Sequence, residues 1–260
     1  MKKNNLNLSL GRIQKAATQI ITADESSKII PICSAIYIMC PDGLRIISAG
    51  HSLNVKDYER LMIPLHGERE ALFLCFLGDL ATTGIEGNVE NNPIDFAEVK
   101  ILKKDRIKQL LKYHDPIRIS EVDFCHNPID GDARYLVFGH PTSKSKFDYK
   151  THKKFDSVPL KLITSPITDK NLYQKYGYSK KEHVLLKIQK NITEGKDRLI
   201  LPKTKGLSGC GVYFLPNLNK SEPSGAFKLV GILTEVDFKR RFAVVVRIST
   251  IYGEKSPLTF

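Results

Sequence analysis

A serine framed by three glycines stands in the stretch Gly206-Leu207-Ser208-Gly209-Cys210-Gly211. Glycine permits backbone angles and close approaches that a Cβ atom would block. A tight turn at this point would present the Ser208 hydroxyl and direct the backbone amides of Gly206 and Ser208 into one small space. Paired amides of this kind can hold an oxygen atom that gains negative charge during acyl transfer. Taken by itself, the stretch is more simply an ordinary Gly/Ser loop between two strands.

A histidine and an aspartate upstream supply the two further groups that such a serine needs. His51 stands near the end of an apolar segment that begins at Ile46, and Asp95 opens a second apolar segment that runs to Ile101. A serine hydroxyl is a poor nucleophile until a base takes its proton, and imidazole, with an ordinary pKa of about 6.5, suits that task. The imidazole in turn needs a carboxylate to fix its tautomer and offset its positive charge. The chain therefore contains the three parts of a catalytic triad, in the order His51, Asp95, Ser208.

Four short motifs follow one another along most of the chain. They are Ser-Ala-Gly-His at 48–51, Asp-Phe-Ala-Glu-Val-Lys-Ile at 95–101, Gly-Leu-Ser-Gly at 206–209 and Leu-Val-Gly-Ile-Leu-Thr at 229–234. In this order they resemble the trypsin/chymotrypsin-like serine peptidases, in particular the bacterial and intracellular members of that family. The resemblance implies an all-β fold of two six-stranded antiparallel Greek-key β-barrels, to which this chain adds an N-terminal helix. The active site would lie in the cleft between the barrels.

The same resemblance implies a role for each candidate residue. Ser208 would be the nucleophile, His51 its base and Asp95 the group that holds the base, while the amides of Gly206 and Ser208 would form the oxyanion hole. The expected activity is that of a serine endopeptidase that forms an acyl-enzyme and needs no cofactor and no metal. The expected partner is a protein or peptide substrate, and a regulatory protein partner is compatible with a chain that shows no second recognisable domain. The alternative function is a protease-like module on the same fold that binds peptides or a partner without cleaving them.

The pocket for the substrate side chain is expected just upstream of the serine turn, near Pro202 and Lys203. Trypsin-like enzymes carry an acidic residue at the base of this pocket, and none is present there, so cleavage after Lys or Arg is not favoured. Thr234 matches the position where the family places a hydroxyl that supports the triad carboxylate. Glu235 or Asp237 could restore an acidic wall, which leaves the specificity open.

The composition indicates a globular, cytoplasmic protein. A chain of 260 residues can bury a sizeable core without disulfides. There is no apolar run of about 18 residues that would span a membrane, and the basic N-terminus is not followed by a secretory apolar region. Five cysteines without regular spacing favour reduced thiols, although Cys33 and Cys40 could pair if the chain were exported. Cys125-His126 is too isolated to indicate zinc, and Cys210 is expected to be a small buried residue.

The net charge of +12 has two interpretations, a solvated basic surface or a surface that binds nucleic acid or an acidic partner. The basic residues are spread along the chain, and no helix-turn-helix, zinc-finger or RNP pattern concentrates them, so the solvated surface is favoured over nucleic acid. Tyr173, Tyr176 and Tyr178 alternate with lysines in a segment that we interpret as a surface insertion rather than a platform for stacking bases.

Apolar spacing and turn residues place the elements. Residues 1–30 are expected to form a helical extension, with the helix over 9–22; residues 31–112 would form the first barrel and residues 113–260 the second. An Asp-Gly turn at 42–43 predicts a hairpin of strands over 34–40 and 44–49.

The remaining predictions concern the connections between strands. The run at 71–77 is compatible with a short helix and is interpreted as a strand, and a helix over 103–113 should link the barrels. Residues 142–157 should form a long exposed loop. His140 is expected to be structural, and Glu98 departs from the apolar residue usual at its position.

Overall fold

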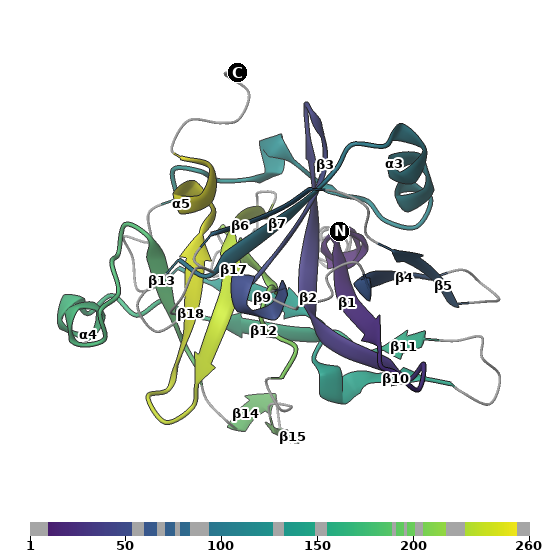
Figure 1. The fold of residues 1–260 in the computed structure, drawn as a ribbon. Helices are drawn as coiled ribbons and strands as arrows, with labels where there is room; N and C mark the ends of the chain where they lie inside the picture. Colours follow the sequence, from purple (N-terminus) through teal and green to yellow (C-terminus); the bar gives the residue numbers. More distant parts are fainter. Residues whose placement is uncertain are drawn as a thin grey trace, which may run out of the picture.

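Strands are the main secondary structure of the described residues, and they gather into two units. In the computed structural model the described residues are 10–53, 60–66, 71–75, 79–83, 94–126, 133–148, 155–188, 191–194, 197–200, 205–216 and 227–253. The purple and blue strands of the first unit lie beside the green and yellow strands of the second (Figure 1). Within the described residues, no helix is long and apolar enough to cross a membrane.

The first unit is an eight-stranded sheet. Its strands are β1 (Ala17–Ala23), β2 (Ile29–Cys40), β3 (Gly43–Ser48), β4 (Met62–His66), β5 (Ala71–Cys75), β6 (Asp79–Thr83), β7 (Phe96–Ile101) and β8 (Ile117–Arg118). They are ordered β5-β4-β1-β2-β3-β7-β6, and β8 pairs with β2 in parallel. β-branched residues fill these strands because a branched side chain packs well on a pleated, half-buried surface. The Pro41-Asp42 turn joins β2 to β3, as the sequence predicts.

The second unit is a six-stranded antiparallel sheet. Its strands are β9 (Tyr135–Gly139), β12 (Leu160–Thr164), β13 (His183–Lys187), β16 (Gly211–Phe214), β17 (Lys228–Asp237) and β18 (Phe242–Arg247), in the order β12-β9-β16-β17-β18-β13. A bridge between Pro166, just after β12, and Leu186 of β13 brings the two edge strands together. The sheet therefore closes on itself as a barrel.

Two hairpins and several short helices complete the chain. The hairpins are β10 (Ser145–Phe147) with β11 (Phe155–Ser157) and β14 (Asn191–Glu194) with β15 (Asp197–Ile200). The helices are α2 (Gly50–Leu53), α3 (Lys104–Leu111), α4 (Lys170–Lys175) and α5 (Ile248–Tyr252), with 3-10 turns η3 (Ile119–Glu121) and η4 (Thr142–Lys144). Helix α3 and strand β5 confirm the predictions for those segments.

A shared core joins the two barrels. It contains Ile36 and Ile47 of the first sheet together with Phe138, Ile232 and Val246 of the second, all of them buried. On the rim of this core, Tyr252 of α5 donates a hydrogen bond to Glu98 of β7, whose carboxylate also pairs with Arg45 of β3. Glu98, the departure from the family pattern, is thus half-buried and neutralised rather than turned to solvent.

The predicted helix over 9–22 is wrong in its second half. Residues 10–16 are helical, but Ala17–Ala23 forms β1 and pairs with β2, with Ile20 opposite Cys33. Pairing with a neighbouring strand decides in favour of extended backbone, which suits the β-branched run Thr18–Thr22. The first sheet accordingly begins inside the predicted extension of residues 1–30, and it also takes up β8, which lies beyond the predicted boundary at 113.

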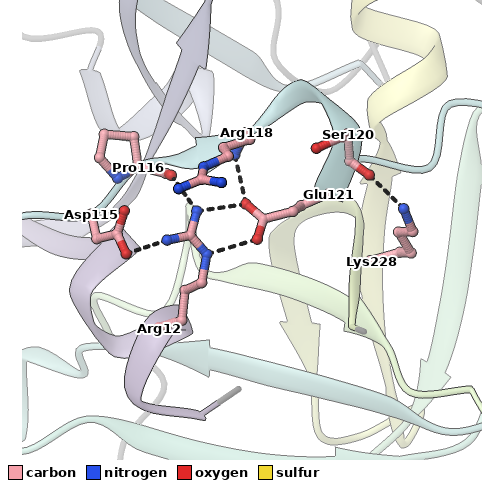
Figure 2. Close-up of polar contacts among 7 residues, drawn as sticks. All are labelled: Arg12, Asp115, Pro116, Arg118, Ser120, Glu121 and Lys228. Carbon is pink, nitrogen blue, oxygen red and sulfur yellow. Dashed lines mark hydrogen bonds and ion pairs between the residues drawn. The ribbon is translucent and has the colours of Figure 1, made fainter. Parts of the chain in front are cut away.

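Arg12 ties the N-terminal helical turn to the segment that links the barrels (Figure 2). Its guanidinium donates to both Glu121 carboxylate oxygens at 2.7 Å, to the Pro116 carbonyl at 3.1 Å and to Asp115. Glu121 also accepts the backbone amide of Arg118 at 2.8 Å. A planar guanidinium suits this two-pronged recognition of a carboxylate.

Three further expectations are corrected by the structure. Residues 142–157 are not simply a loop, because they contain η4 and the β10–β11 hairpin. The segment with three tyrosines, predicted as a surface insertion, is not wholly at the surface, because Tyr173 is buried and packs with Phe242 in a small core of its own. Cys33 and Cys40 are free thiols that lie seven residues apart on β2 and face different cores, so they cannot pair.

Candidate active site

The register of β3 and β7 brings His51 to Asp95. Ser48 lies opposite Ala97 in this antiparallel pair, so the residues just after β3 and just before β7 are neighbours. The His51 ring nitrogen Nδ1 hydrogen-bonds one Asp95 carboxylate oxygen, and the His51 backbone amide donates to the other at 2.7 Å. Gly50 makes the approach possible, because a Cβ there would lie 2.9 Å from the Phe96 carbonyl and 3.0 Å from Asp95 Oδ1.

The surroundings of His51 make it a stronger base than a free imidazole. The hydrogen bond to Asp95 raises the pKa of His51 above its ordinary 6.5, partial burial lowers it, and the negative charges of Asp95 and Glu235 raise it further. The His51 side chain is 38% exposed. The imidazole is therefore held from one side by a carboxylate and stays accessible from the other.

Ser208 lies in a tight turn that two glycines shape. Gly206 and Gly209 have φ angles of +88° and +85°, in the left-handed region that favours glycine. The Gly209 amide donates to the Leu233 carbonyl at 2.7 Å, and the Ser208 hydroxyl donates to the Thr234 carbonyl at 3.3 Å. The turn is thus fixed to β17 by one backbone and one side-chain hydrogen bond.

The serine turn is also docked on the first barrel, through Ser34 of β2. The Ser34 amide donates to the Ser208 carbonyl at 3.0 Å, and the Ser34 hydroxyl donates to the Gly206 carbonyl at 2.8 Å. At Gly209 the backbones are so close that a Cβ would collide with the Ser34 carbonyl and the Ser48 hydroxyl. Because Ser48 ends β3, three residues before His51, the turn lies against the strands that carry the histidine.

The amides of Gly206 and Ser208 have no acceptor in the described part of the chain. The neighbouring amides of Gly209 and Cys210 are used by Leu233 and Leu207. Gly206 is pressed against Thr142, whose amide and hydroxyl both bond to the Lys205 carbonyl at 2.9 and 3.0 Å. Within the described residues, these two amides are therefore left without an acceptor in a turn anchored on both sides, and their role as an oxyanion hole stays a prediction.

Among the described residues no hydrogen bond joins His51 to Ser208, and their links to β17 go to different residues. The hydroxyl of Ser208 donates to the Thr234 carbonyl, while the charge of the next residue, Glu235, acts on the His51 imidazole. The structure thus joins His51 to Asp95 directly and brings Ser208 to Thr234. Contacts within catalytic groups are often long in unliganded enzymes and tighten when substrate binds.

The structure places the predicted substrate-binding residues in different surroundings. Pro202 and Lys203 lie outside the described residues. The Thr234 hydroxyl donates at 3.4 Å to the Val244 carbonyl across the sheet, not to Asp95, so the support expected for the triad carboxylate is not formed. Glu235 is exposed and accepts a hydrogen bond from Tyr178 at 3.0 Å, whereas Asp237 pairs with Arg240.

Cys210 and His140 occupy structural positions. Complete burial raises the pKa of the Cys210 thiol to about 12, so it is not a nucleophile at neutral pH. His140 is buried, and its amide donates to the Ser34 hydroxyl at 2.8 Å. No cluster of three or more metal-binding side chains occurs among the residues that the structure describes.

Ser34 and Ser48 are the site residues that sequence reasoning missed. Both are fully buried, and the Ser48 hydroxyl donates to the Ser34 carbonyl at 2.7 Å. Ser48 opens the Ser-Ala-Gly-His motif at 48–51, but nothing in that motif indicates a contact with the serine turn, and Ser34 is a single serine among the apolar residues of β2. Their role follows from the packing of the serine turn on those strands.

Neither a protein-family model nor a curated protein sequence matches this chain. Its fold, however, is similar to solved structures. The inactivated protease paralogue S-D1 of the scabies mite aligns with a TM-score of 0.54 at 12% identity, over 95% of this chain and 96% of that one. The VesB protease of Vibrio cholerae aligns with a TM-score of 0.54 at 11% identity, over 94% of this chain and 63% of that one.

Proteases of two plant viruses show a weaker similarity. The tobacco vein mottling virus protease aligns with a TM-score of 0.46 and the tobacco etch virus protease with 0.45, at 12% and 14% identity. These scores carry no further conclusion.

Proposed function

The chain has the two-barrel, all-β fold of the trypsin-like proteases, and from this premise we propose that it is a serine endopeptidase acting on protein or peptide substrates. The docking of the Ser208 turn on Ser34 carries the proposal. It brings a glycine-framed serine of one barrel against the strands that end in a hydrogen-bonded His51–Asp95 pair in the other. Acyl transfer needs these three residue types at one point, and the docking of the serine turn on β2 and β3 supports that arrangement.

The proposed reaction uses only side chains and amides of this chain. Ser208 Oγ attacks the scissile carbonyl carbon while His51 accepts the hydroxyl proton, and the amides of Gly206 and Ser208 bind the oxyanion. The C–N bond then breaks, and His51 returns the proton to the leaving amine. Water, deprotonated by His51, hydrolyses the acyl-enzyme by the same route. Asp95 holds the imidazole in one tautomer and stabilises its protonated form.

One local movement prepares Ser208 for this role. Its hydroxyl must leave the Thr234 carbonyl, to which it donates at 3.3 Å. That distance is long for an O–H···O hydrogen bond, so little is lost when it breaks. Rotation about the Cα–Cβ bond redirects the hydroxyl without moving the turn.

Labelling with a fluorophosphonate probe tests the proposal. The probe forms a covalent bond with an activated serine, so the native protein should be labelled and the Ser208→Ala variant should not. Ser26→Ala is the matched control, because Ser26 lies in an exposed turn where its hydroxyl bonds to Asp24 at 2.7 Å. Thermal unfolding of all three proteins verifies that each is folded. Equal labelling of native protein and Ser208→Ala would refute Ser208 as the nucleophile.

The second candidate function is a protease-like module that binds peptides without cleaving them. The similarity to an inactivated protease paralogue and the bond from Ser208 to Thr234 favour it. It predicts that the native protein is not labelled at any pH, while a peptide still binds. The intact His51, Asp95 and Ser208 favour the enzyme.

We also propose that the protein works in the cytoplasm. The support is that Cys33, Cys40, Cys125 and Cys210 are all free thiols in the part of the chain that the structure describes. Free thiols are typical of reducing compartments.

A further inference from the structure

Beside the serine turn, one edge of β17 has no partner strand among the described residues, and we call it the open edge. Strand β16 pairs with β17 only as far as Ile232, the backbone of Leu233 bonds to Gly209 and Cys210, and from Thr234 to Asp237 the described partner of β17 is β18. Thr234 is the extra residue in this stretch, because Leu233 and Glu235 pair with the consecutive residues Val245 and Val244. An unpaired strand edge can accept an extended peptide as a further strand. A substrate strand added here would pass Thr234 and Glu235.

Glu235 is an exposed acid without a cationic partner. Among the described residues its hydrogen bond comes from the Tyr178 hydroxyl, at 3.0 Å to Glu235 Oε2, and it takes part in none of the ion pairs. The chain carries 40 Lys and Arg residues against 28 acids, so an unpaired acid is conspicuous. Its charge reaches His51, whose pKa it helps to raise. Glu235 directly follows Thr234, whose carbonyl accepts the Ser208 hydroxyl at 3.3 Å, and among the described residues its carboxylate has no cationic partner.

Asp237, two residues further along β17, is different. Its carboxylate accepts the Arg240 backbone amide at 2.9 Å and pairs with the Arg240 side chain at 3.3 Å. The guanidinium also lies over the ring of Tyr176, 4.4 Å from its centre. Asp237 is thus neutralised within its own hairpin and has little charge to offer a ligand.

We propose that Glu235 is a specificity-determining residue that selects a Lys or Arg side chain of the substrate close to the scissile bond. This inference rests on the proposed peptidase function and assigns its substrate class. The selected cation lies in a substrate strand along the open edge of β17, and its ammonium or guanidinium pairs with the carboxylate that Tyr178 orients. The segment just upstream of the serine turn carries no acidic residue. This role does not need one there, because the carboxylate that would bind the cation is that of Glu235 on β17.

The size of the expected preference follows from the exposure of Glu235. Exposed ion pairs are weak, and a charge-assisted hydrogen bond adds to them. A preference for a cationic over a neutral side chain of about fivefold in kcat/KM is what such a pair gives. It should weaken as salt is added, because the pair is open to screening.

A positional library of fluorogenic peptides, varied at the four residues before the cleaved bond, tests the inference. At each position the ratio of kcat/KM for Lys to that for norleucine, an uncharged side chain of similar length, is measured for three proteins. They are the native protein, Glu235→Gln and Asp237→Asn. The ratio removes any change in His51 basicity that loss of the Glu235 charge causes, because both peptides meet the same imidazole.

The native protein should prefer lysine at one position by about fivefold, Glu235→Gln should bring that ratio close to one, and Asp237→Asn should keep it. If the native protein cleaves without a lysine preference, or if Glu235→Gln retains it, the inference is overturned and the peptidase function stands. If the native protein cleaves no peptide and Ser208 is not labelled by fluorophosphonate, the proposed function fails, and the inference that rests on it fails too.

Discussion

The hydroxyl of Ser34, on the second strand of the first barrel, donates a 2.8 Å hydrogen bond to the carbonyl of Gly206 in the second barrel. The same oxygen accepts the amide of His140 at 2.8 Å. One buried hydroxyl therefore satisfies two backbone groups, one at the end of β9 and one in the serine turn. A turn that must aim two amides at one point needs such an anchor, because its glycines give it little rigidity of their own.

Ser34→Ala should lower both stability and reactivity. It leaves the His140 amide and the Gly206 carbonyl buried without this partner, which costs about 1–3 kcal/mol in unfolding free energy. It should also slow fluorophosphonate labelling of Ser208, because the oxyanion turn loses one anchor. Urea unfolding and the labelling rate measure the two effects. Ser179→Ala, which removes an exposed hydroxyl that accepts from the Lys181 amide at 3.2 Å, should change stability by less than about 0.5 kcal/mol.

Gly209→Ala should be far more damaging than Gly177→Ala. Both glycines have positive φ angles, +85° and +73°. A Cβ at Gly177 meets nothing within 4 Å, so that substitution carries only the backbone strain of about 1 kcal/mol. A Cβ at Gly209 collides with the Ser34 carbonyl and the Ser48 hydroxyl, so the serine turn must move away from β2.

For Gly177→Ala and Gly209→Ala, the unfolding free energy and the rate of fluorophosphonate labelling of Ser208 are measured. We expect Gly177→Ala to be labelled at the native rate and Gly209→Ala to lose labelling even where it is folded. Similar stability and labelling in the two variants would mean that the close approach at Gly209 does not hold the serine turn.

The sequence predicted the all-β, two-barrel fold, which the structure confirms, whereas the catalytic roles of His51, Asp95 and Ser208 stay predictions. His51, Asp95 and Ser208 stand in short motifs whose residue types are unusual together, so the pattern could be read without coordinates. The helix over 9–22 failed because the spacing of Ile13, Ala17 and Ile20 suits a helix, while pairing with β2 decides the backbone. Ser34 could not be found at all, since its importance arises only when a turn from the other barrel packs on it.

Asp95→Asn should slow the labelling of Ser208 and move its pH profile. In the proposed mechanism neutral His51 is the base, so reactivity is lost as the pH falls through the pKa of His51, which Asp95 raises above 6.5. The acidic limb of labelling rate against pH should therefore lie above pH 6.5 in the native protein. Loss of the Asp95 charge should shift it to lower pH and reduce the plateau by about 10⁴.

A second His–Asp pair supplies the control for this change. His126 Nδ1 lies 3.2 Å from Asp123, and its other ring nitrogen bonds to Tyr135 at 2.7 Å. His126 is buried and Asp123 is partly exposed, and among the described residues neither shares a hydrogen bond with the serine turn, so Asp123→Asn should leave the acidic limb where it is. If the labelling rate of Asp95→Asn falls at the same pH as that of the native protein, the proposed role of Asp95 is contradicted.

Arg12→Met should release the N-terminal helical turn from the segment between the barrels. The substitution leaves Glu121 half-buried without the guanidinium that donates to both of its oxygens at 2.7 Å (Figure 2). We expect a loss of about 2–3 kcal/mol in unfolding free energy, the range for hydrogen bonds to charged groups. Arg12→Lys should recover only part of it, because an ammonium cannot form the two-pronged contact. Lys100→Met, which removes a more exposed ion pair with Asp42 at 2.6 Å, should lose less than about 1 kcal/mol.

The pH dependence of the unfolding free energy distinguishes two ways in which Arg12 could stabilise the helical turn. One is its ion pair with Glu121, and the other is the packing of its aliphatic stem. Burial alone would raise the pKa of Glu121, but the hydrogen bonds from Arg12 and from the Arg118 amide outweigh it and hold the pKa below its ordinary 4.5. A carboxylate with a lowered pKa stabilises the fold above pH 4.5, and this contribution is lost as the pH falls through the lowered pKa. Urea unfolding between pH 6 and pH 3 should therefore show a steeper loss of stability in the native protein than in Arg12→Met. Parallel curves would mean that Arg12 stabilises the helical turn through its aliphatic stem rather than through its charge.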